Sequence, residues 1–457
     1  MRSRISAYLI VICALCVTAI TQAAPNAPVP QLPGYPIAGS AGQQGPMAPA
    51  ANPQSALTLK QAEDLAIKNN PQISVARLQA LASQQVTREY RSGFWPTAVV
   101  DVTGVDSNES RVTAGGLNNP IIYERAATGA TVSQLITDFG RTRNLTSSAN
   151  YAAKAEDQNA LATKEQVLLA VDQAFYGALQ AQAVLAVAQQ TVSARQAVTD
   201  QVDALFQSKL KSELDLSFAK VNLAQAKLLL LDADNNRSAA LASLSMVLGF
   251  ETAQNFNLAD DSASTTEPPA EVNNLIAQAF GARPEILSQQ FAYQSAQKFH
   301  SAEKDLFYPD IRAMGAVGDT PVRNPVLSNW YGAFGVNVEV PVFNGFLFNA
   351  RSRESSLQAQ AAHDRLVDLR NRISRDVRTS WLNANTAYQR LSVTQQLLDQ
   401  ANLAFGLAQT RYKLGLSSIV ELSQAQLQQT QAEISNAQAG YDYKLALAVL
   451  RYQTTGI

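Results

Sequence analysis

Hydrophobic and polar residues follow a period of two in parts of this chain. Residues 334–342 are the clearest case, because large apolar residues alternate there with small or polar ones: Phe334, Val336, Val338, Val340 and Val342. This alternation predicts a β-strand with one apolar face. Residues 97–106 and 129–137 alternate less cleanly and are also predicted as strands. The polar segments 107–128 and 318–329, rich in Gly, Asn and Pro, are predicted as connecting loops.

Two other segments, residues 141–209 and 349–413, lack proline and have apolar residues at helical spacing. In each segment a row of residues steps by seven: Leu185, Val192, Thr199 and Phe206, then Leu391, Leu398, Phe405 and Tyr412. The length predicts helices of roughly 100 Å, and the heptads predict left-handed supercoiling against neighbouring helices. Gln and Ala occupy many core positions, which favours a narrow seam between helices packed side by side in a curved wall.

The chain also repeats itself. Residues 59–71 resemble residues 272–284, and Trp95-Pro96 and Tyr308-Pro309 share the same offset of 213. Further on the offset is 206, as three pairs show: Phe175 with Trp381, Phe206 with Tyr412, and residues 214–217 with residues 420–423. We infer a tandem duplication of about 200 residues. Each half is predicted to contain a helical stretch of about forty residues (57–93 and 271–307), two strands, a very long helix and a shorter one.

The N-terminal residues differ from the rest. Arg2 and Arg4 precede an apolar stretch too short to span a bilayer, which predicts a signal peptide over residues 1–23. The alternative is an N-terminal membrane anchor. Eight of the 18 prolines lie in residues 24–54, which we predict to be a disordered leader. The repeats are then assigned to residues 55–256 and 271–457, with a linker at 257–270.

Both cysteines, Cys13 and Cys16, lie within the predicted signal peptide. Neither follows the small residue that a lipoprotein cleavage site needs, so we expect no lipid anchor. The mature chain would contain no cysteine, so its stability must come from packing or from assembly.

Composition and motifs exclude several functions. Charged residues make up 16% of the chain and the net charge is -1, which argues against nucleic acid as a partner. The two histidines, His300 and His363, are far apart in sequence and form no zinc motif. Asp260-Asp261 is interpreted as part of the linker, because Ser262 and Pro268-Pro269 lie close by. The chain also lacks a phosphate-binding GxxxxGK[ST] loop and a GxSxG nucleophile elbow. We therefore expect no enzymatic activity, no cofactor and no metal.

Four predicted strands raise a packing problem for an exported chain. They cannot close a barrel alone, and an open sheet edge is not viable in lipid. Several protomers that each donate strands to one closed barrel of even strand number solve the problem. Long helices projecting from such a barrel would form a tube.

Four sequence segments make the comparison with a known family specific. They are Leu57-Thr-Leu-Lys-Gln-Ala with Asn69-Asn-Pro71, Gly93-Phe-Trp-Pro96, Phe139-Gly140-Arg141, and Tyr412-Lys-Leu-Gly-Leu-Ser-Ser-Ile-Val-Glu-Leu-Ser-Gln-Ala425. With the order of elements, they make residues 55–455 resemble the outer membrane efflux protein family, the TolC-like channels.

This resemblance implies a fold class that is mainly α with a small antiparallel β part. Three protomers would form a twelve-stranded β-barrel in the outer membrane lipid and a long coiled-coil α-helical barrel in the periplasm of a Gram-negative cell. The homotrimer would be the exit duct of a tripartite efflux or type I secretion system. It would receive substrates from an inner membrane RND, ABC or MFS transporter through a periplasmic adaptor.

The resemblance also implies functional residues. Glu421 matches an acidic position that lines the closed periplasmic entrance in the family, and Asp215 is its equivalent in the first repeat. A second acidic position of some relatives is Gln424 here, so the ring of carboxylates would be single. Tyr412 matches a tyrosine that holds the entrance shut by hydrogen bonding. In the alternative interpretation, Asp215 and Glu421 only stabilise helix N-termini and Tyr412 is a heptad core residue.

The two turns between long and short helices are expected at the periplasmic tip, where they would dock the adaptor. Their residues are Lys209, Leu210, Lys211, Ser212, Gly415, Leu416, Ser417 and Ser418. Gly415 is predicted to end its helix in a left-handed cap. Lys209 takes its place in the first repeat, so the two turns need not be identical.

A second functional class stays open from the sequence alone: an exported coiled-coil structural protein of the cell envelope without a pore. The alternating residues 334–342 favour the channel, because a fibre would not need a strand with one apolar face.

Overall fold

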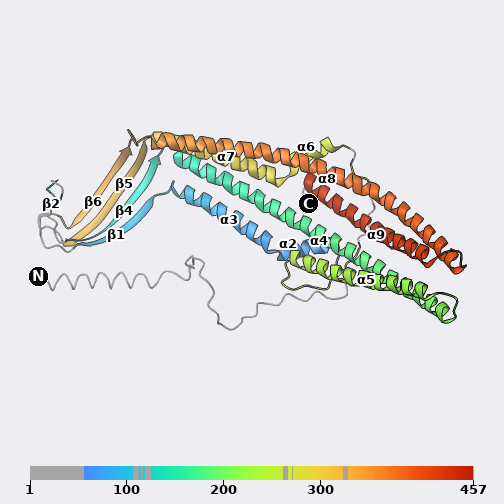
Figure 1. Ribbon diagram of the computed structural model, residues 1–457. Helices are drawn as coiled ribbons and strands as arrows, with labels where there is room; N and C mark the ends of the chain where they lie inside the picture. Colours follow the sequence, from blue (N-terminus) through green and yellow to red (C-terminus); the bar gives the residue numbers. More distant parts are fainter. Residues whose placement is uncertain are drawn as a thin grey trace, which may run out of the picture. The chain divides into compact units, whose positions relative to one another are not determined.

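The computed structural model describes residues 56–105, 113–114, 117–118, 125–260, 266–269, 271–322 and 328–455 (Figure 1). The predicted signal peptide and leader lie outside the described residues. Elements are labelled as in Figure 1. Within residues 53–457, the strands lie at one end of the long helices and the turns between long and short helices lie at the other.

Four strands form one antiparallel sheet in the order β1-β4-β5-β6. Their bounds are β1 (Thr97–Val105), β4 (Arg125–Thr137), β5 (Asp310–Val322) and β6 (Trp330–Glu339). A separate pair, β2 (Thr113–Ala114) and β3 (Leu117–Asn118), lies within the predicted loop 107–128.

The predicted strands exist, but their bounds differ from expectation. β4 starts at Arg125 and β5 runs to Val322, so both strands extend into segments predicted as loops. β6 ends at Glu339, three residues before the end of the alternating pattern. Pro341 has no backbone N–H to donate to a neighbouring strand, so the alternation of Val340 and Val342 does not continue the ladder.

The sheet has one apolar and one polar face. The register places Val100 of β1, Val132 of β4 and Phe334 of β6 on the same face, and all three are exposed in the single chain. Asp101 and Asn337 point to the opposite face, since neighbours along a strand alternate in direction.

The predicted forty-residue helical stretches are each two helices. The first comprises α2 (Leu59–Asn69) and α3 (Pro71–Ser92). The second comprises α6 (Val272–Ala282), α7 (Pro284–Lys304) and a short 3-10 turn, η1 (Asp305–Phe307). Both breaks occur directly before a proline, which disfavours helical conformation in the preceding residue and is well suited to the first turn of the next helix.

The long helices agree closely with the sequence. α4 (Arg141–Gln207) and α8 (Leu347–Lys413) each have 67 residues, a length of roughly 100 Å. They are followed by α5 (Glu213–Val247) and α9 (Ile419–Thr455). Between residues 387 and 408 the buried positions of α8 are small residues at heptad spacing: Ala387, Thr394, Ala401 and Ala408. The narrow seam is therefore present in this part of α8, but it lies on a different row from the predicted one, whose members Leu391, Leu398 and Phe405 are half-buried.

The helices follow the order of the strands. α3 packs against α4, α4 against α7, and α7 against α8, which matches β1-β4-β5-β6. Nearer the turns, α4 packs against α5 and α9, and α9 packs against α8. The unpaired edges of the chain are thus β1 with α3 on one side and β6 with α8 on the other.

A belt surrounds the middle of the long helices. We use this name for α2, α6 and residues 441–455 of α9, with the parts of α4 and α8 that they cover. α2 packs on α4 around Val171 and Phe175, and α6 packs on α8 around Ile373 and Val377. The duplication of the chain is therefore visible in its packing.

The described residues of the predicted linker 257–270 lie against the helices of the belt. Leu57 exchanges backbone hydrogen bonds with Asn257 and Ala259. Lys444 contacts Asp260 at 2.6 Å, and Trp381 donates its indole N–H to the carbonyl of Pro269 at 2.6 Å. This part of the linker is consequently held against the helices.

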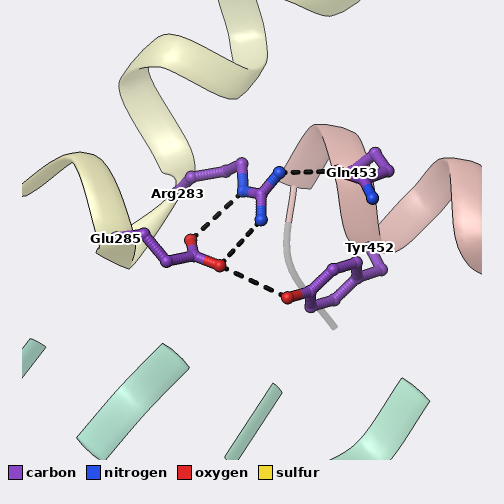
Figure 2. A network of polar contacts seen from close by, with 4 residues as sticks. All are labelled: Arg283, Glu285, Tyr452 and Gln453. Atoms are coloured by element: carbon purple, nitrogen blue, oxygen red, sulfur yellow. Dashed lines mark hydrogen bonds and ion pairs between the residues drawn. The ribbon is translucent and has the colours of Figure 1, made fainter. Parts of the chain in front are cut away.

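A network of polar side chains connects the junction of α6 and α7 to the end of α9 (Figure 2). The guanidinium of Arg283 donates to both carboxylate oxygens of Glu285, and it also donates to Gln453 at 2.6 Å. Tyr452 donates its hydroxyl to Glu285 at 3.3 Å. Because Arg283 is buried and has a bidentate partner, its charge is compensated.

None of the helices in the described part of the chain combines the length and apolar character needed to cross a membrane.

Candidate functional site at the two helix turns

The predicted tip residues form two turns with the same backbone. Lys209 and Gly415 both adopt the left-handed conformation, with φ of 61° and 74°. In each turn the next residue donates its N–H back into the helix, Leu210 to Leu205 at 2.9 Å and Leu416 to Arg411 at 2.8 Å. The left-handed cap at Gly415 is confirmed. The two turns have the same backbone although their residues differ, because Lys209 accepts a conformation that glycine adopts at lower cost.

One apolar cluster joins the ends of α4, α5, α8 and α9. It contains Val202, Leu216, Ala219, Ala408, Tyr412, Ile419, Leu422 and Ala425. Both turns are therefore fixed to a common core, and a movement of one hairpin against the other must disturb it.

Tyr412 lies inside this cluster and is only 5% exposed. The ammonium of Lys211 lies 3.9 Å from its ring centroid, so the first turn contacts the last residues of α8. The hydroxyl of Tyr412 has no hydrogen-bond partner among the described residues of the chain. Burial, and then the negative charge of Asp215, raises the pKa of Tyr412 to about 12. The phenol is thus neutral and able to donate, but the described residues of its own chain offer it no acceptor.

Asp215 belongs to a helix cap. Its carboxylate accepts from the N–H and the hydroxyl of Ser212, at 3.0 and 2.7 Å, and its own N–H donates to the Ser212 oxygen. This reciprocal capping box fixes the start of α5. From the sequence, Asp215 could either line the entrance or stabilise a helix N-terminus. Its contacts in the structure are those of a helix-stabilising residue.

Glu421 has a different environment. Its carboxylate lies 3.3 Å from the guanidinium of Arg411 on α8, and both side chains are substantially exposed. Its N–H donates to the Ser418 hydroxyl at 3.4 Å. Arg411, Glu421 and Gln424 line one cavity of about 480 Å³ on the α8–α9 hairpin. Sequence reasoning missed Arg411, although its position next to Tyr412 in the last turn of α8 was a usable signal.

The turns present apolar side chains to solvent. Leu210 and Leu416 occupy equivalent positions and are 70% and 65% exposed. Further exposed apolar residues adjoin them: Leu214, Leu414 and Val420. Most of the other predicted docking residues are also exposed, except that Lys211 and Ser417 are half-buried.

The two histidines are closer in space than the sequence suggested. His300 and His363 line one cavity of about 750 Å³ between α7 and α8. His300 faces Ser355 at 2.9 Å, however, while His363 packs against Tyr293, and eight residues of α8 separate these two levels, a rise of about 12 Å. Among the described residues, no group of three or more His, Cys, Asp or Glu side chains is placed to hold a metal ion.

Comparison with known proteins shows which family has this arrangement of strands, helices and turns. The model of the outer membrane efflux protein family matches residues 63–250 and 275–455. The chain belongs to this family. It is 22% identical to the outer membrane protein TolC of Escherichia coli (strain K12) over 422 residues, which cover 87% of this chain and 84% of TolC.

Solved channels have the same fold as this outer membrane efflux protein. CusC superposes with a TM-score of 0.76 at 18% identity, over 87% of this chain and 92% of CusC. VceC of Vibrio cholerae superposes with a TM-score of 0.75 at 15% identity, over 87% of this chain and 96% of VceC. The predicted fold class, with its helical barrel, small antiparallel sheet and internal repeat, is confirmed.

The family also decides between the functional classes. The chain is an outer membrane efflux channel, an exit duct of the kind used in tripartite efflux, and not a fibre without a pore. Its family is one of channels rather than of enzymes.

Proposed function

We propose that three copies of this chain form one continuous duct from the periplasm through the outer membrane, closed at its inner end by the two turns. The observation that carries this proposal is the matched order of strands and helices. β1 with α3 and β6 with α8 are left unpaired on opposite sides of the chain, so one copy joins the next through the sheet and the helices together.

Exposed apolar residues support this assembly. On the edge helix α3 they are Val75, Leu78, Leu81, Val86 and Tyr90, and on the edge helix α8 they include Leu357, Val367, Leu382 and Val393. Three copies of a four-stranded sheet give a barrel of twelve strands, an even number as in bacterial outer membrane barrels. The apolar face of the sheet then contacts lipid and the polar face lines the pore.

The entrance is assigned to Glu421, with Gln424 beside it and Tyr412 as the closing residue. Three copies bring three Glu421 carboxylates together, each accompanied by Arg411 at 3.3 Å. The pairs reduce the net negative charge of the ring, so its attraction for cations is weaker than that of three free carboxylates. The hydroxyl of Tyr412 has no partner among the described residues and is buried in its own chain, so it reaches an acceptor on a neighbouring copy only if the turns shift on assembly. Asp215 is not assigned to the entrance, and its role is to fix the start of α5 through the capping box with Ser212.

Partners and location complete the proposal. The exposed residues of the two turns dock a periplasmic adaptor, which connects the duct to an inner membrane RND, ABC or MFS transporter. Exposed leucines at equivalent positions in both turns support such a contact, because apolar patches on a surface mark interaction sites. The chain is exported by its signal peptide to the outer membrane of a Gram-negative cell and has no lipid anchor.

A bilayer experiment tests the entrance assignment. Purified protein in detergent should have the mass of a trimer and should conduct ions in planar bilayers. We expect Arg411→Gln to increase cation selectivity, because it frees the Glu421 carboxylates, and Glu421→Gln to decrease it. Tyr412→Phe, which removes only the hydroxyl, should raise the open fraction.

Asp232→Asn on the exposed face of α5 is the control for loss of one carboxylate and should behave like the wild type. Recovery of the protein from the periplasm as a water-soluble monomer would refute the duct. Trimeric channels whose selectivity is the same in all variants would refute the entrance assignment alone.

A further inference from the structure

Arg195, in α4 about 20 Å from the turn, is a buried charge without a carboxylate partner. Its side chain belongs to the seam between α4 and α9 and the residue is 8% exposed. Nη2 donates to the carbonyl oxygen of Gln426 at 2.8 Å and to the hydroxyl of Thr430 at 3.0 Å. Among the described residues, no carboxylate oxygen lies within 4 Å of it. Buried charges are normally paired, because desolvation of a lone ion is costly.

The acidic residue whose charge acts on Arg195 does not contact it. Glu433 favours the charged guanidinium through space, but no ion pair within 4 Å joins the two side chains. Burial lowers the pKa of Arg195 to about 10, so the guanidinium stays charged at neutral pH. The positive charge is therefore permanent, and no carboxylate of the described residues contacts it directly.

A cavity of about 340 Å³ adjoins the guanidinium, between α4, α5 and α9. Hydrogen-bonding side chains surround its polar part: Thr191, Arg195, Asn222, Ser423, Gln426 and Thr430. Gln426 is 3% exposed, and its side-chain N–H₂ has no hydrogen-bond partner in the described part of the chain. Asn222 donates to Ser423 at 2.7 Å and so braces α5 against α9. The cavity thus contains one fixed cation and one unsatisfied buried donor.

The internal repeat shows that packing does not require this arginine. The equivalent position in the second repeat, 206 residues later, is Ala401, which is also buried at 7% exposure. Alanine suits the narrow seam between these helices, whereas arginine adds a charge that must be desolvated. A contribution other than packing is needed to explain the difference.

We propose that this cavity binds a small oxyanion, a carboxylate or a phosphate, between the first-repeat helices α4 and α5 and the second-repeat helix α9. The guanidinium of Arg195 supplies the charge and the amide of Gln426 supplies a second donor. The bound ion completes the pairing of Arg195 and holds the two hairpins together. This inference goes beyond the proposed duct and does not depend on it.

The binding test uses the full-length protein purified in detergent at pH 7.5. Inorganic phosphate and acetate are titrated separately at constant ionic strength with chloride as the balancing salt. Binding is followed by calorimetry and by the thermal unfolding midpoint. We expect a saturable rise of the midpoint with at least one probe, because a ligand specific for the folded state stabilises it. Response to phosphate alone identifies a phosphoryl ligand, and response to acetate identifies a carboxylate.

Two variants test the residues. Arg195→Gln should weaken binding at least tenfold. Gln426→Glu places a carboxylate beside Arg195, so it should raise the unfolding midpoint without added anion and abolish the response to both probes. Gln428→Glu, on the exposed surface of the same helix, is the matched control and should keep the wild-type response.

The absence of a saturable response to either probe in the wild type would overturn the proposal. A wild-type response in Gln426→Glu would overturn it as well, even if Arg195→Gln fails to fold.

Discussion

The two turns at the end of the hairpins have the same backbone but different side-chain contacts. Asp215 in the first turn is held by Ser212 within its own helix cap. Its equivalent in the second turn, Glu421, pairs with Arg411 on the preceding helix. The duplication has thus preserved the backbone of the turn while the two carboxylates serve different contacts: one fixes a helix end and the other connects two helices of a hairpin.

The two repeats also differ in the ionisable residues that they place in the belt. The first repeat places Glu165 and Asp172 on one face of α4, two turns apart, and the corresponding residues of α8 are Asn371 and Arg378. Burial, and then the charge of Glu285, raises the pKa of Glu165 to about 7. Burial, and then the charge of Glu63, raises the pKa of Asp172 to about 7. The two repeats share a fold, but at these positions only the first has carboxyls, one buried and one half-buried, whose pKa is raised to about 7.

The largest difference between the turns should appear on truncation of their aromatic residues. Tyr412→Ala removes a buried ring from the common core and should lower the free energy of unfolding by about 3–5 kcal/mol. Phe206→Ala should cost less, because Phe206 is only partly buried. Chemical denaturation followed by circular dichroism measures both. An equal loss in the two variants would contradict the comparison.

The belt should make stability depend on pH. The pKa of Asp172 is raised from its ordinary value to about 7 in the folded chain, so the folded state binds more protons than the unfolded state between these values. The contribution of Asp172 to stability is then greatest below pH 4 and falls by up to about 4 kcal/mol as the pH rises to 7. Glu165 acts in the same direction. Thermal unfolding midpoints between pH 4 and 8 measure this slope.

Variants locate the source of that slope. Asp172→Asn should remove somewhat more than half of it, and the double variant with Glu165→Gln should remove most of the rest. Asp200→Asn, an exposed residue of the same helix, should leave it unchanged. A slope that persists in the double variant would show that other groups titrate.

Exchange of the left-handed residues tests whether the two backbones are alike. Gly415→Ala should cost about 1–2 kcal/mol from the left-handed conformation, since no atom lies within 4 Å of the added Cβ position. Lys209→Gly should increase stability by up to about 1 kcal/mol, because it relieves the same conformation in the first turn. Denaturant midpoints of both variants give the signs. If both substitutions changed the stability in the same direction, the two turns would not have the same backbone strain.

The two carboxylates should have the smallest effects on stability. Ser212→Ala breaks the capping box of Asp215 and should cost about 1 kcal/mol. Glu421→Gln breaks an exposed ion pair and should cost about 0–1 kcal/mol, less at high salt. Thermal unfolding at low and high ionic strength separates the two contributions. A larger, salt-independent loss for Glu421→Gln would indicate that its carboxylate is buried in the assembly.

Local chemistry explains the accuracy of the sequence-based predictions. Helix bounds at Arg141 and Lys413 depend on glycine, proline and apolar spacing within a few residues, so they were predicted within two positions. The strand bounds were less accurate, since the extent of β4 and β5 depends on their pairing with each other.

The candidate site was only partly predictable. Gly415 and the turn residues were found, because each depends on its neighbours in sequence. The Arg411–Glu421 pair, the Lys211–Tyr412 contact and the environment of Arg195 were missed. The Arg195 contacts join residues 231 and 235 positions apart, and no local pattern encodes the register between such helices.

The sequence by itself determined the duplication, the two helices of roughly 100 Å and the alternating strand near the end of the sheet. These features follow from periodicity and from proline and glycine placement, which act on the backbone locally. Only the tertiary structure decided which carboxylates cap a helix, which pair with arginine and which are buried among apolar side chains. The free energy of a charge depends on what surrounds it in space, and packing of distant helices supplies those surroundings.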